Sequence, residues 1–277
     1  MPEQYIYSQG PELTILIPHY KTLGLSKLCL RSIKLFTDLD KVKVIVIDND
    51  SNDQSLEYLR SINWIKLIER KDIADESPAK MHAKALDLGM EHVKTKYVLS
   101  IHTDTIVTSS EWLSFLFSRI KEADDIAGIG SWKLEHKPWF KSMAKRLEHI
   151  FQTKIWFPLT RRGSGAIVGL GDNHYYLRSH CALYQTELIR KYTDGFFDSG
   201  ETAGKALHRK LIEKGYQMSF IPTEKLGKYM KHLNHATMIL NPEIAGKRTG
   251  KPKAYKRIMK ELKSVGYDRI IKNNDLD

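Results

Sequence analysis

Cysteine is scarce in this chain: Cys29 and Cys181 are the only two among its 277 residues. They share no paired spacing, and Cys29 falls on the apolar face of a predicted helix, so we expect free thiols in a reducing compartment. His174 and His180 precede Cys181, but a second cysteine pair is missing and the spacing matches no compact zinc pattern. A disulfide framework and a structural zinc site are therefore disfavoured.

Long apolar runs are missing as well. No stretch of about 18 apolar residues occurs, so the sequence predicts no membrane-spanning helix. Residues 1–10 lack the basic and then apolar pattern of a signal peptide, and we expect a cytoplasmic protein that can also meet the inner face of a membrane. The glycines between 163 and 171 are not followed by Gly-Lys-Ser/Thr, which argues against a P-loop and favours a flexible acceptor loop or lid.

The charge balance is basic, with 44 Lys and Arg against 33 Asp and Glu, a net charge of +11. Such a surface suits a polyanion, an anionic membrane or phosphorylated substrates. No nucleic-acid-binding module is recognisable and the basic residues are spread along the chain, so nucleic acid is disfavoured as a partner.

The N-terminal part of the chain alternates short apolar runs with helical patterns. Strands are predicted at 13–17, 43–47, 65–68 and 97–101, and helices from about Ser26, at 56–59 and at 79–93. This alternation indicates βα units and a mostly parallel sheet. The strand ends at Pro18, Asp48, Glu69 and His102 then converge on one edge, the edge at which open α/β sheets bind ligands.

Residues 97–107 show this arrangement most clearly. An apolar run from Tyr97 to Ile101 is followed directly by His102, Thr103 and Asp104. A buried strand ending in hydroxyls and a carboxylate predicts a ligand contact, and the alternative is a polar turn that merely leaves the strand.

The second half of the chain has a different pattern. We predict a helix capped by Ser110, strands at 126–130 and 180–184, and a helix from Thr186 to Tyr192. Residues 137–162 mix tryptophan and phenylalanine with basic residues. That composition suits a membrane-surface helix with a lipid-linked acceptor, an aromatic platform for sugars, or packing under the acceptor lobe.

Five landmarks follow one another in order along the chain. They are Pro18-His19-Tyr20-Lys21 closing a strand, Asp48-Asn49-Asp50-Ser51-Asn52-Asp53 closing the next, Ala83-Lys84-Ala85-Leu86-Asp87-Leu88-Gly89 on a helix, the stretch 97–107, and Asp194-Gly195-Phe196-Phe197-Asp198 before a helix ending in Lys214-Gly215-Tyr216. Their order resembles the family-2 glycosyltransferases with a GT-A fold, over residues 11–222.

The resemblance implies an α/β fold of the GT-A, Rossmann-like type, with a mixed, mostly parallel sheet flanked by helices in a single two-lobed domain. It implies a nucleotide-sugar-binding half at 1–106, an acceptor-binding and catalytic half at 107–243, and a basic C-terminal tail at 244–277. The chain departs from the family pattern at three points: His102 stands at the first acid of the Asp-x-Asp motif, Lys21 replaces an asparagine, and the Glu-Asp pair before the last helix is not reproduced in register.

For the nucleotide, the resemblance implies a site built from strand ends. Asp48 would accept hydrogen bonds from a uracil N–H or ribose hydroxyls, with an Asx turn as the alternative. The other residues expected there are Pro18, His19, Tyr20, Asp50, Lys80 and Thr103, and uridine is the default base of the family. Lys84 fits a solvated helix face better.

For the metal, the resemblance implies Mg²⁺ or Mn²⁺ beside the diphosphate, held by Asp104. A single carboxylate suffices for such an ion. His102 is expected to be a second metal ligand, to hydrogen-bond the phosphate instead, or only to pack against the strand. His232 or His235 is expected to be a third ligand or else a surface residue.

The expected reaction is inverting transfer of a sugar from a nucleotide-diphosphate donor to a hydroxyl of a glycan or lipid-linked acceptor. Glu201 is the expected general base, with Asp198 second and a helix-capping role as the alternative. Two other functions stay open: a nucleotidyltransferase, which should show a Gly-rich basic loop after the first strand, and a catalytically altered nucleotide-sugar-binding protein.

Overall fold

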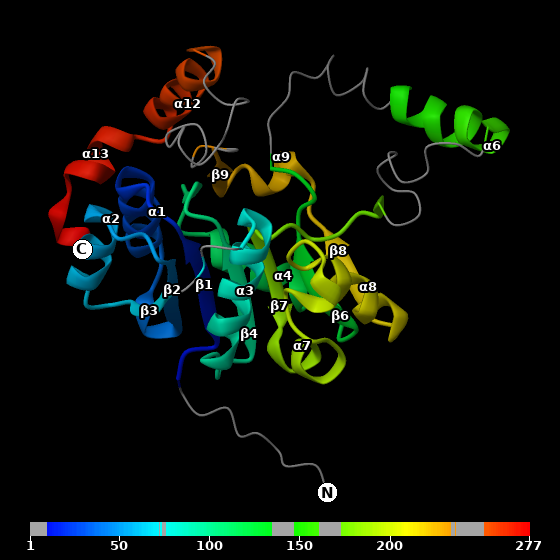
Figure 1. Cartoon of the computed structure of the whole chain (residues 1–277), viewed down its shortest axis with the longest axis horizontal. Coiled ribbons are helices and arrows are strands. Elements are labelled where there is room, and N and C mark those ends of the chain that lie inside the picture. Colours follow the sequence, from blue (N-terminus) through cyan, green and yellow to red (C-terminus); the bar gives the residue numbers. More distant parts are fainter. Residues whose placement is uncertain are drawn as a thin grey trace, which may run out of the picture.

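A seven-stranded sheet in the order β3-β2-β1-β4-β7-β6-β8 runs through the molecule, with helices on both faces (Figure 1). The computed structural model describes residues 10–71, 73, 76–134, 147–160, 173–233, 236 and 252–277. One sheet therefore spans both of the predicted halves of the chain.

The first four strands of this sheet are parallel neighbours, as the sequence predicts. They are β1 (Leu13–His19), β2 (Val42–Asn49), β3 (Lys66–Arg70) and β4 (Tyr97–Ile101). The crossovers between them contain α1 (Leu23–Phe36), the 3₁₀ turn η1 (Leu39–Lys41), α2 (Gln54–Ser61) and α3 (Pro78–Glu91). All four carboxyl ends consequently lie at the same edge of the sheet.

The other strands make the sheet mixed. They are β6 (Ile126–Gly130), β7 (Cys181–Gln185) and β8 (Gln217–Phe220). β7 runs antiparallel to both β4 and β6, while β8 is parallel to β6. The helices of this part are α4 (Trp112–Ile120), α7 (Thr186–Tyr192), α8 (Lys205–Glu213) and α9 (Thr223–Leu226), with the 3₁₀ turn η4 (Asp198–Gly200) before α8. The mostly parallel α/β sheet predicted from the sequence is confirmed.

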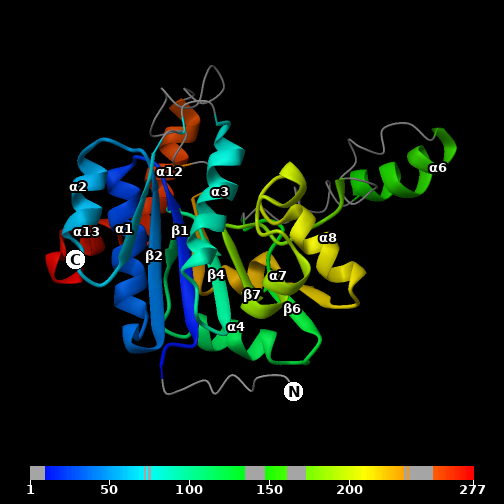
Figure 2. The same cartoon turned by 60° about the horizontal axis from the view of Figure 1, so that its bottom comes forward.

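Two apolar cores lie on opposite faces of the sheet, and Figure 2 shows helices packed on the sheet. Alternation along β1 divides its side chains between them, because successive residues of a strand point to opposite faces. Ile15 packs in the core of α1 and α4, whereas Leu16 packs in the core of α3, α7 and α8. Nearly every residue of β1, β2 and β4 is buried, as expected for strands covered on both sides.

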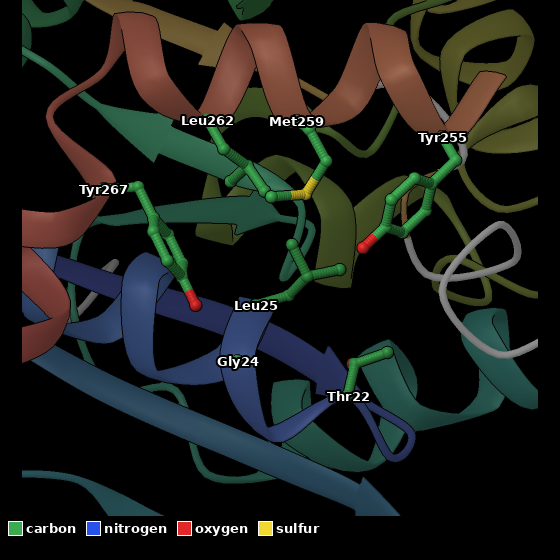
Figure 3. A pocket seen from close by; sticks show the side chains of 7 residues that line it. All are labelled: Thr22, Gly24, Leu25, Tyr255, Met259, Leu262 and Tyr267. Carbon is green, nitrogen blue, oxygen red and sulfur yellow. The ribbon is translucent and has the colours of Figure 1, made fainter. Parts of the chain in front are cut away.

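The segment after residue 251 packs against the N-terminal half. It forms α12 (Pro252–Ser264), α13 (Tyr267–Lys272) and the 3₁₀ turn η6 (Asn274–Leu276). Ile258, Leu262 and Ile270 from this segment belong to the same core as α1. A cavity of about 360 Å³ remains between α1 and α12, lined by Thr22, Gly24, Leu25, Tyr255, Met259, Leu262 and Tyr267 (Figure 3). Residues 252–277 of the predicted tail are thus part of the folded body.

Three local predictions were wrong. β1 does not stop at Pro18 but continues to His19; β4 pairs only with Leu13 to Leu16, so Pro18 has a strand neighbour on one side only, where proline is tolerated. Ser26 is not an N-cap: it lies inside α1 and donates to the carbonyl of Thr22 over 3.1 Å. Ser110 is not one either, because Glu111 occupies the N-cap position of α4.

The predictions about the two cysteines and about membrane-spanning helices can be compared with the structure. Cys29 and Cys181 are both buried free thiols, which confirms that they form no disulfide with each other. None of the helices in the described part of the chain has the length and apolar character needed to cross a membrane.

Candidate active site

The turn after β4 carries the central residues of the site. β4 ends at Ile101, and His102, Thr103 and Asp104 follow before the short strand β5 (Thr105–Val107). The backbone N–H of Thr105 donates to the carbonyl of His102 over 3.0 Å, which closes the turn tightly. Thr103 and Asp104 are buried, whereas the side chain of His102 is 32% exposed. A ligand at the sheet edge therefore meets His102 first.

A second, two-stranded sheet brings His232 to this turn. β9 (Met230–His232) pairs antiparallel with β5 in a register that sets Thr105 opposite His232. The N–H of Leu233 then donates to the carbonyl of Asp104 over 2.8 Å. A residue far along the chain is thus fixed next to Asp104 by backbone pairing rather than by side-chain contacts alone.

His102, Asp104 and His232 form a compact set of possible metal ligands. One nitrogen or oxygen atom from each lies within 4.8 Å of the others. Nε2 of His232 is 3.1 Å and Nδ1 of His102 is 3.8 Å from Oδ1 of Asp104. Nε2 of His232 is buried without an aligned hydrogen-bond partner among the described residues. A buried ring nitrogen left beside a carboxylate is what a shared cation would join, so the three side chains could hold a metal.

The surroundings of Asp104 and His102 favour the protonation states in which these side chains can bind a metal ion. Burial by itself would raise the pKa of Asp104, but His232 and His102 outweigh it and hold that pKa well below its ordinary value. Burial lowers the pKa of His102 far below its ordinary value, and the neighbouring His82 lowers it further. At neutral pH the turn therefore presents a carboxylate and a neutral imidazole, the states that bind metal ions.

Two further histidines surround the ligand set, and neither was predicted to take part in it. The ring of His82, from α3, lies 4.7 Å from that of His102, and the ring of His180 stacks at 4.7 Å on that of His232. Burial lowers the pKa of His82 to about 4 and that of His180 well below its ordinary value. His180 had been considered only for zinc, and no spacing signal connects His82 with residues 102–104. Only the folded sheet edge brings the four rings together.

The nucleotide residues predicted from β1 and β2 lie side by side at the sheet edge. β1 and β2 pair in register up to His19 opposite Asp48. Nδ1 of His19 lies 2.6 Å from Oδ1 of Asp48, and Ser51 donates to the same carboxylate, through its backbone N–H over 3.0 Å and through its hydroxyl. Burial would raise the pKa of Asp48, but these hydrogen bonds keep it low. Asp48 is thus an enclosed carboxylate, covered by His19.

The other predicted nucleotide residues border the same edge. Tyr20 is half-buried, and the Nζ of Lys21 lies 5.3 Å from the centre of its ring. Asp50 has a left-handed backbone with φ 55° and accepts from the side chain of Asn52 over 2.6 Å. Lys80 lies in the first turn of α3, whose N-cap is Ser77. Lys84, further along that helix, pairs with Glu76 at 2.7 Å.

The two predicted bases lie together near the start of α8, each paired with cations. Oε1 and Oε2 of Glu201 are 2.8 Å from Arg209 and 2.9 Å from Lys205. Asp198 has a fully buried side chain, which pairs with Lys210 at 2.8 Å and accepts from the backbone N–H of Asp194. In both cases burial would raise the pKa of the carboxyl, but the cations outweigh it and the pKa is lowered. Of the two, Glu201 is the more accessible, with 24% of its side chain exposed.

Several predictions fall on parts of the chain outside the described residues. These are the glycine run 163–171, His235, and residues 137–146, 161 and 162 of the aromatic, basic segment 137–162. Within that segment residues 147–160 are described and are helical, with the π-helical turn η2 (Gln152–Trp156) and the final turn α6 (Phe157–Thr160).

Comparison with known proteins gives one match to a sequence family and many to solved structures. The sequence model of glycosyl transferase family 2 matches residues 14–193. No curated protein sequence matches the chain.

Two solved structures are given as examples of these matches. One is the mannosyltransferase PcManGT from Pyrobaculum calidifontis in complex with GDP-Man and Mn²⁺; it is 15% identical with a TM-score of 0.55, over 95% of this chain and 73% of that one. The other is glucosyl-3-phosphoglycerate synthase from Mycobacterium tuberculosis in complex with Mn²⁺, UDP-glucose and phosphoglyceric acid. It is 15% identical with a TM-score of 0.48, over 93% and 80% of the two chains.

Proposed function

The chain belongs to glycosyl transferase family 2, and we propose that it is an inverting, metal-dependent enzyme that moves a sugar from a nucleotide-diphosphate donor to a hydroxyl of a glycan or lipid-linked acceptor. The observation that carries the proposal is the set of His102, Asp104 and His232 at the carboxyl end of β4, beside the ends of β1 and β2. Ligands of open α/β sheets bind at this edge.

The donor is proposed to lie along this edge, with its nucleoside toward β1 and β2. Pro18, His19, Tyr20 and Asp50 would border the base and ribose, with Asp48 holding His19 in place. Thr103 and Lys80 would lie on the diphosphate side, where a cationic side chain complements phosphate charge.

A divalent cation, Mg²⁺ or Mn²⁺, is proposed between His102, Asp104 and His232. The anionic carboxylate, the buried Nε2 of His232 beside it at 3.1 Å and the neutral ring of His102 fit such an ion. PcManGT, which shares the fold, was solved with Mn²⁺ and GDP-Man. When bound, the ion supplies positive charge next to the departing diphosphate.

Glu201 is the proposed general base, which takes the proton from the acceptor hydroxyl. Its partial exposure supports this role over Asp198, whose carboxylate is enclosed by Lys210 and the backbone of Asp194. We expect Glu201→Gln to lower kcat on the order of 10²–10⁴-fold, since that is the usual contribution of a general base. Asp198→Asn, if folded, should change kcat less; the reverse ranking would transfer the role to Asp198.

The central experiment is donor turnover with Mn²⁺ across a panel of UDP-, GDP- and dTDP-sugars. The wild-type protein should release free nucleoside diphosphate with at least one of them, and Asp104→Ala should reduce this on the order of 10²-fold. Nucleotide-sugar binding without any turnover would favour the altered binding protein. Release of pyrophosphate from a nucleoside triphosphate and a sugar phosphate would favour the nucleotidyltransferase.

We also propose that residues 147–160 contact an anionic membrane, which would suit a lipid-linked acceptor. Large apolar side chains are exposed along this helix at Leu147, Ile150, Phe151, Ile155, Trp156 and Leu159. Both views show its last turn, α6, well away from the central sheet (Figures 1 and 2). The sequence flanks the helix with Lys141, Lys145 and Arg146 before it and Arg161 and Arg162 after it. Apolar side chains framed by basic residues complement a surface of anionic lipid.

Vesicle co-sedimentation tests this contact. Phe151→Asp with Trp156→Asp should weaken binding to vesicles of phosphatidylcholine and phosphatidylglycerol in equal parts by about tenfold or more, because two exposed aromatic side chains that would enter the membrane are lost. Leu35→Asp is the matched control, since Leu35 is an equally exposed apolar residue on α1. No binding by the wild type, or equal loss in both variants, would rule out the contact.

A further inference from the structure

A single hydroxyl joins two of the histidines at the metal set. Oγ of Ser179, in the turn before β7, lies 3.0 Å from Nε2 of His102 and 2.8 Å from Nε2 of His82. The two rings meet edge to face, with their centres 4.7 Å apart. Ser179 is 9% exposed, so this hydroxyl has little access to water. Three elements, the end of β4, α3 and the turn before β7, therefore meet at one oxygen atom.

The number of hydrogens that Ser179 can donate limits how the two histidines can be protonated. A serine hydroxyl has one hydrogen to donate and can accept two. At least one of the two Nε2 atoms must therefore carry a hydrogen and donate it to Ser179. The opposite nitrogen of His102, Nδ1, lies 3.8 Å from Asp104 and so faces the possible ligands.

A metal ligand nitrogen carries no hydrogen, so the ring hydrogen of a ligating neutral histidine sits on its other nitrogen, usually donated to an oxygen acceptor. For His102 that other nitrogen is Nε2, and its acceptor is Ser179. The hydroxyl hydrogen of Ser179 is then available for Nε2 of His82. Two hydrogen bonds then follow one another: Nε2–H of His102 donates to Oγ of Ser179, and Oγ–H of Ser179 donates to Nε2 of His82. This arrangement leaves Nδ1 of His102 without a hydrogen.

We propose that Ser179, backed by His82, is the positioning residue that holds His102 with Nε2 protonated and Nδ1 turned bare toward the cation site; this inference rests on the divalent cation of the proposed function. The role follows from the residue type at position 102. A carboxylate can coordinate through either oxygen without choosing a tautomer, whereas an imidazole must have the correct nitrogen free. Ser179 and His82 determine which ring nitrogen of His102 carries the hydrogen and which one is free for the cation.

The same turn also supports the third ligand. His180 follows Ser179, and its ring stacks on that of His232 with an interplanar angle of 19°. Nε2 of His180 is itself held by Oγ of Ser131 at 2.8 Å. Consecutive residues of one turn thus orient the two ligating histidines, one through a hydrogen bond and the other through ring packing.

Mn²⁺ titration followed by electron paramagnetic resonance tests the proposal without any need for turnover. Ser179→Ala should weaken Mn²⁺ binding about 10–100-fold, the usual effect of removing the partner of a ligating histidine. Ser179→Thr keeps the hydroxyl and should restore most of the affinity. In a His102→Asp background, Ser179→Ala should have almost no effect, since a carboxylate needs no partner to select a tautomer.

A loss of equal size in the His102 and His102→Asp backgrounds would mean that Ser179 merely supports the fold, and the inference would be wrong. Unchanged Mn²⁺ affinity in Ser179→Ala would also overturn it. Imidazole ¹⁵N–¹H spectra of the metal-free protein give a readout independent of the metal: His102 should be protonated at Nε2 in the wild type and lose that preference in Ser179→Ala. If the wild type binds no Mn²⁺ but shows this tautomer change, the positioning role stands and the metal of the proposed function fails.

Discussion

At the scale of single residues, His102 sets the chemistry of the candidate site. Two ring nitrogens and one carboxylate form the set, whereas Mg²⁺ favours oxygen ligands. Nitrogen ligands shift preference toward Mn²⁺ and other transition metals. The substitution that the family pattern suggests, an acid at position 102, would therefore alter metal preference more than it alters the fold.

We expect the wild-type protein to bind Mn²⁺ at least about tenfold more tightly than Mg²⁺, and His102→Asp to narrow this ratio because it replaces a nitrogen with an oxygen ligand. Competition between the two ions, with bound Mn²⁺ followed by electron paramagnetic resonance, measures the ratio directly. Asp104→Asn serves as a comparison, since it should weaken both ions. An unchanged ratio in His102→Asp would show that His102 is not a ligand.

His208 gives a prediction about stability and pH. It is 1% exposed on α8, its Nδ1 accepts from the backbone N–H of Leu177, and burial, helped by His174, lowers its pKa to about 4. The unfolded chain binds a proton near pH 6.5, so stability falls as pH drops from about 6.5 to about 4 and this contribution is constant below. The loss amounts to about 2 kcal/mol by pH 5 and about 3 kcal/mol by pH 4.

His208→Asn keeps a hydrogen-bond acceptor but cannot titrate. Urea unfolding at a series of pH values should therefore show a shallower acid loss for His208→Asn than for the wild type, by about 2 kcal/mol at pH 5. Other buried histidines contribute to both curves and cancel in the comparison. Parallel curves would mean that His208 is protonated without cost in the folded state.

At the scale of elements, two glycines on helices should respond to alanine in opposite ways. A Cβ at Gly24, in the first turn of α1, would point toward the cavity of Figure 3, with its nearest neighbour, the hydroxyl of Tyr267, at 3.9 Å. A Cβ at Gly89, on α3, would lie 2.9 Å from Leu16 and 3.0 Å from Ile47. We expect Gly24→Ala to raise the free energy of unfolding by about 0.5–1 kcal/mol, because alanine is the better helix former.

Gly89→Ala gains the same helix propensity but forces α3 away from the sheet. Overpacking of this kind costs about 1–3 kcal/mol, so the net change should be destabilising. Thermal unfolding of the two variants beside the wild type compares them. Destabilisation by both would show that the cavity beside α1 cannot accept a methyl group.

The type and order of the elements from β1 to β4 could be predicted from the sequence, while several of their ends could not. Buried strands such as β4 read as uninterrupted apolar runs, because helices cover both faces of the sheet. Ends depend on pairing that the local sequence does not encode. Pro18 looks like a strand end, but β2 continues to pair with β1 beyond it. Ser26 looks like a cap, but the backbone enters α1 earlier, through Lys21 and Thr22 with positive φ.

The candidate site was predictable to the extent that it rests on one turn. His102 and Asp104 lie two residues apart at the end of an apolar run, and the strand end gives their position. The place of His232 beside them depends on the register of β5 and β9, and that of His82 on the packing of α3. Sequence spacing carries no information about either contact.

At the scale of the whole molecule, residues 252–277 connect to the N-terminal half through a buried charge. Arg31 on α1 is 1% exposed. Its Nε donates to Oδ1 of Asp277 over 2.8 Å, and its Nη2 to Oδ1 of Asn274 over 2.9 Å. Oδ1 of Asp277 also accepts from the hydroxyl of Tyr58 over 2.7 Å. The sequence describes this segment as a basic tail because lysine and arginine predominate in it. The contact with Arg31 depends instead on a single acidic residue, Asp277, so the overall charge does not predict it.

Asp277→Ala should lower the free energy of unfolding by about 2–3 kcal/mol, since it leaves the guanidinium of Arg31 buried with fewer partners. Arg31→Met should also be destabilising alone, because it leaves Asp277 without its cation. The double variant should cost at least about 1.5 kcal/mol less than the sum of the two, because an apolar side chain of similar length no longer needs the carboxylate. Urea unfolding of all four proteins measures this coupling. Additive effects would show that Arg31 and Asp277 do not stabilise each other, and that other contacts, such as the apolar packing of Ile258, Leu262 and Ile270 and the hydrogen bond from Lys34 to the carbonyl of Asp277, hold the segment to the body.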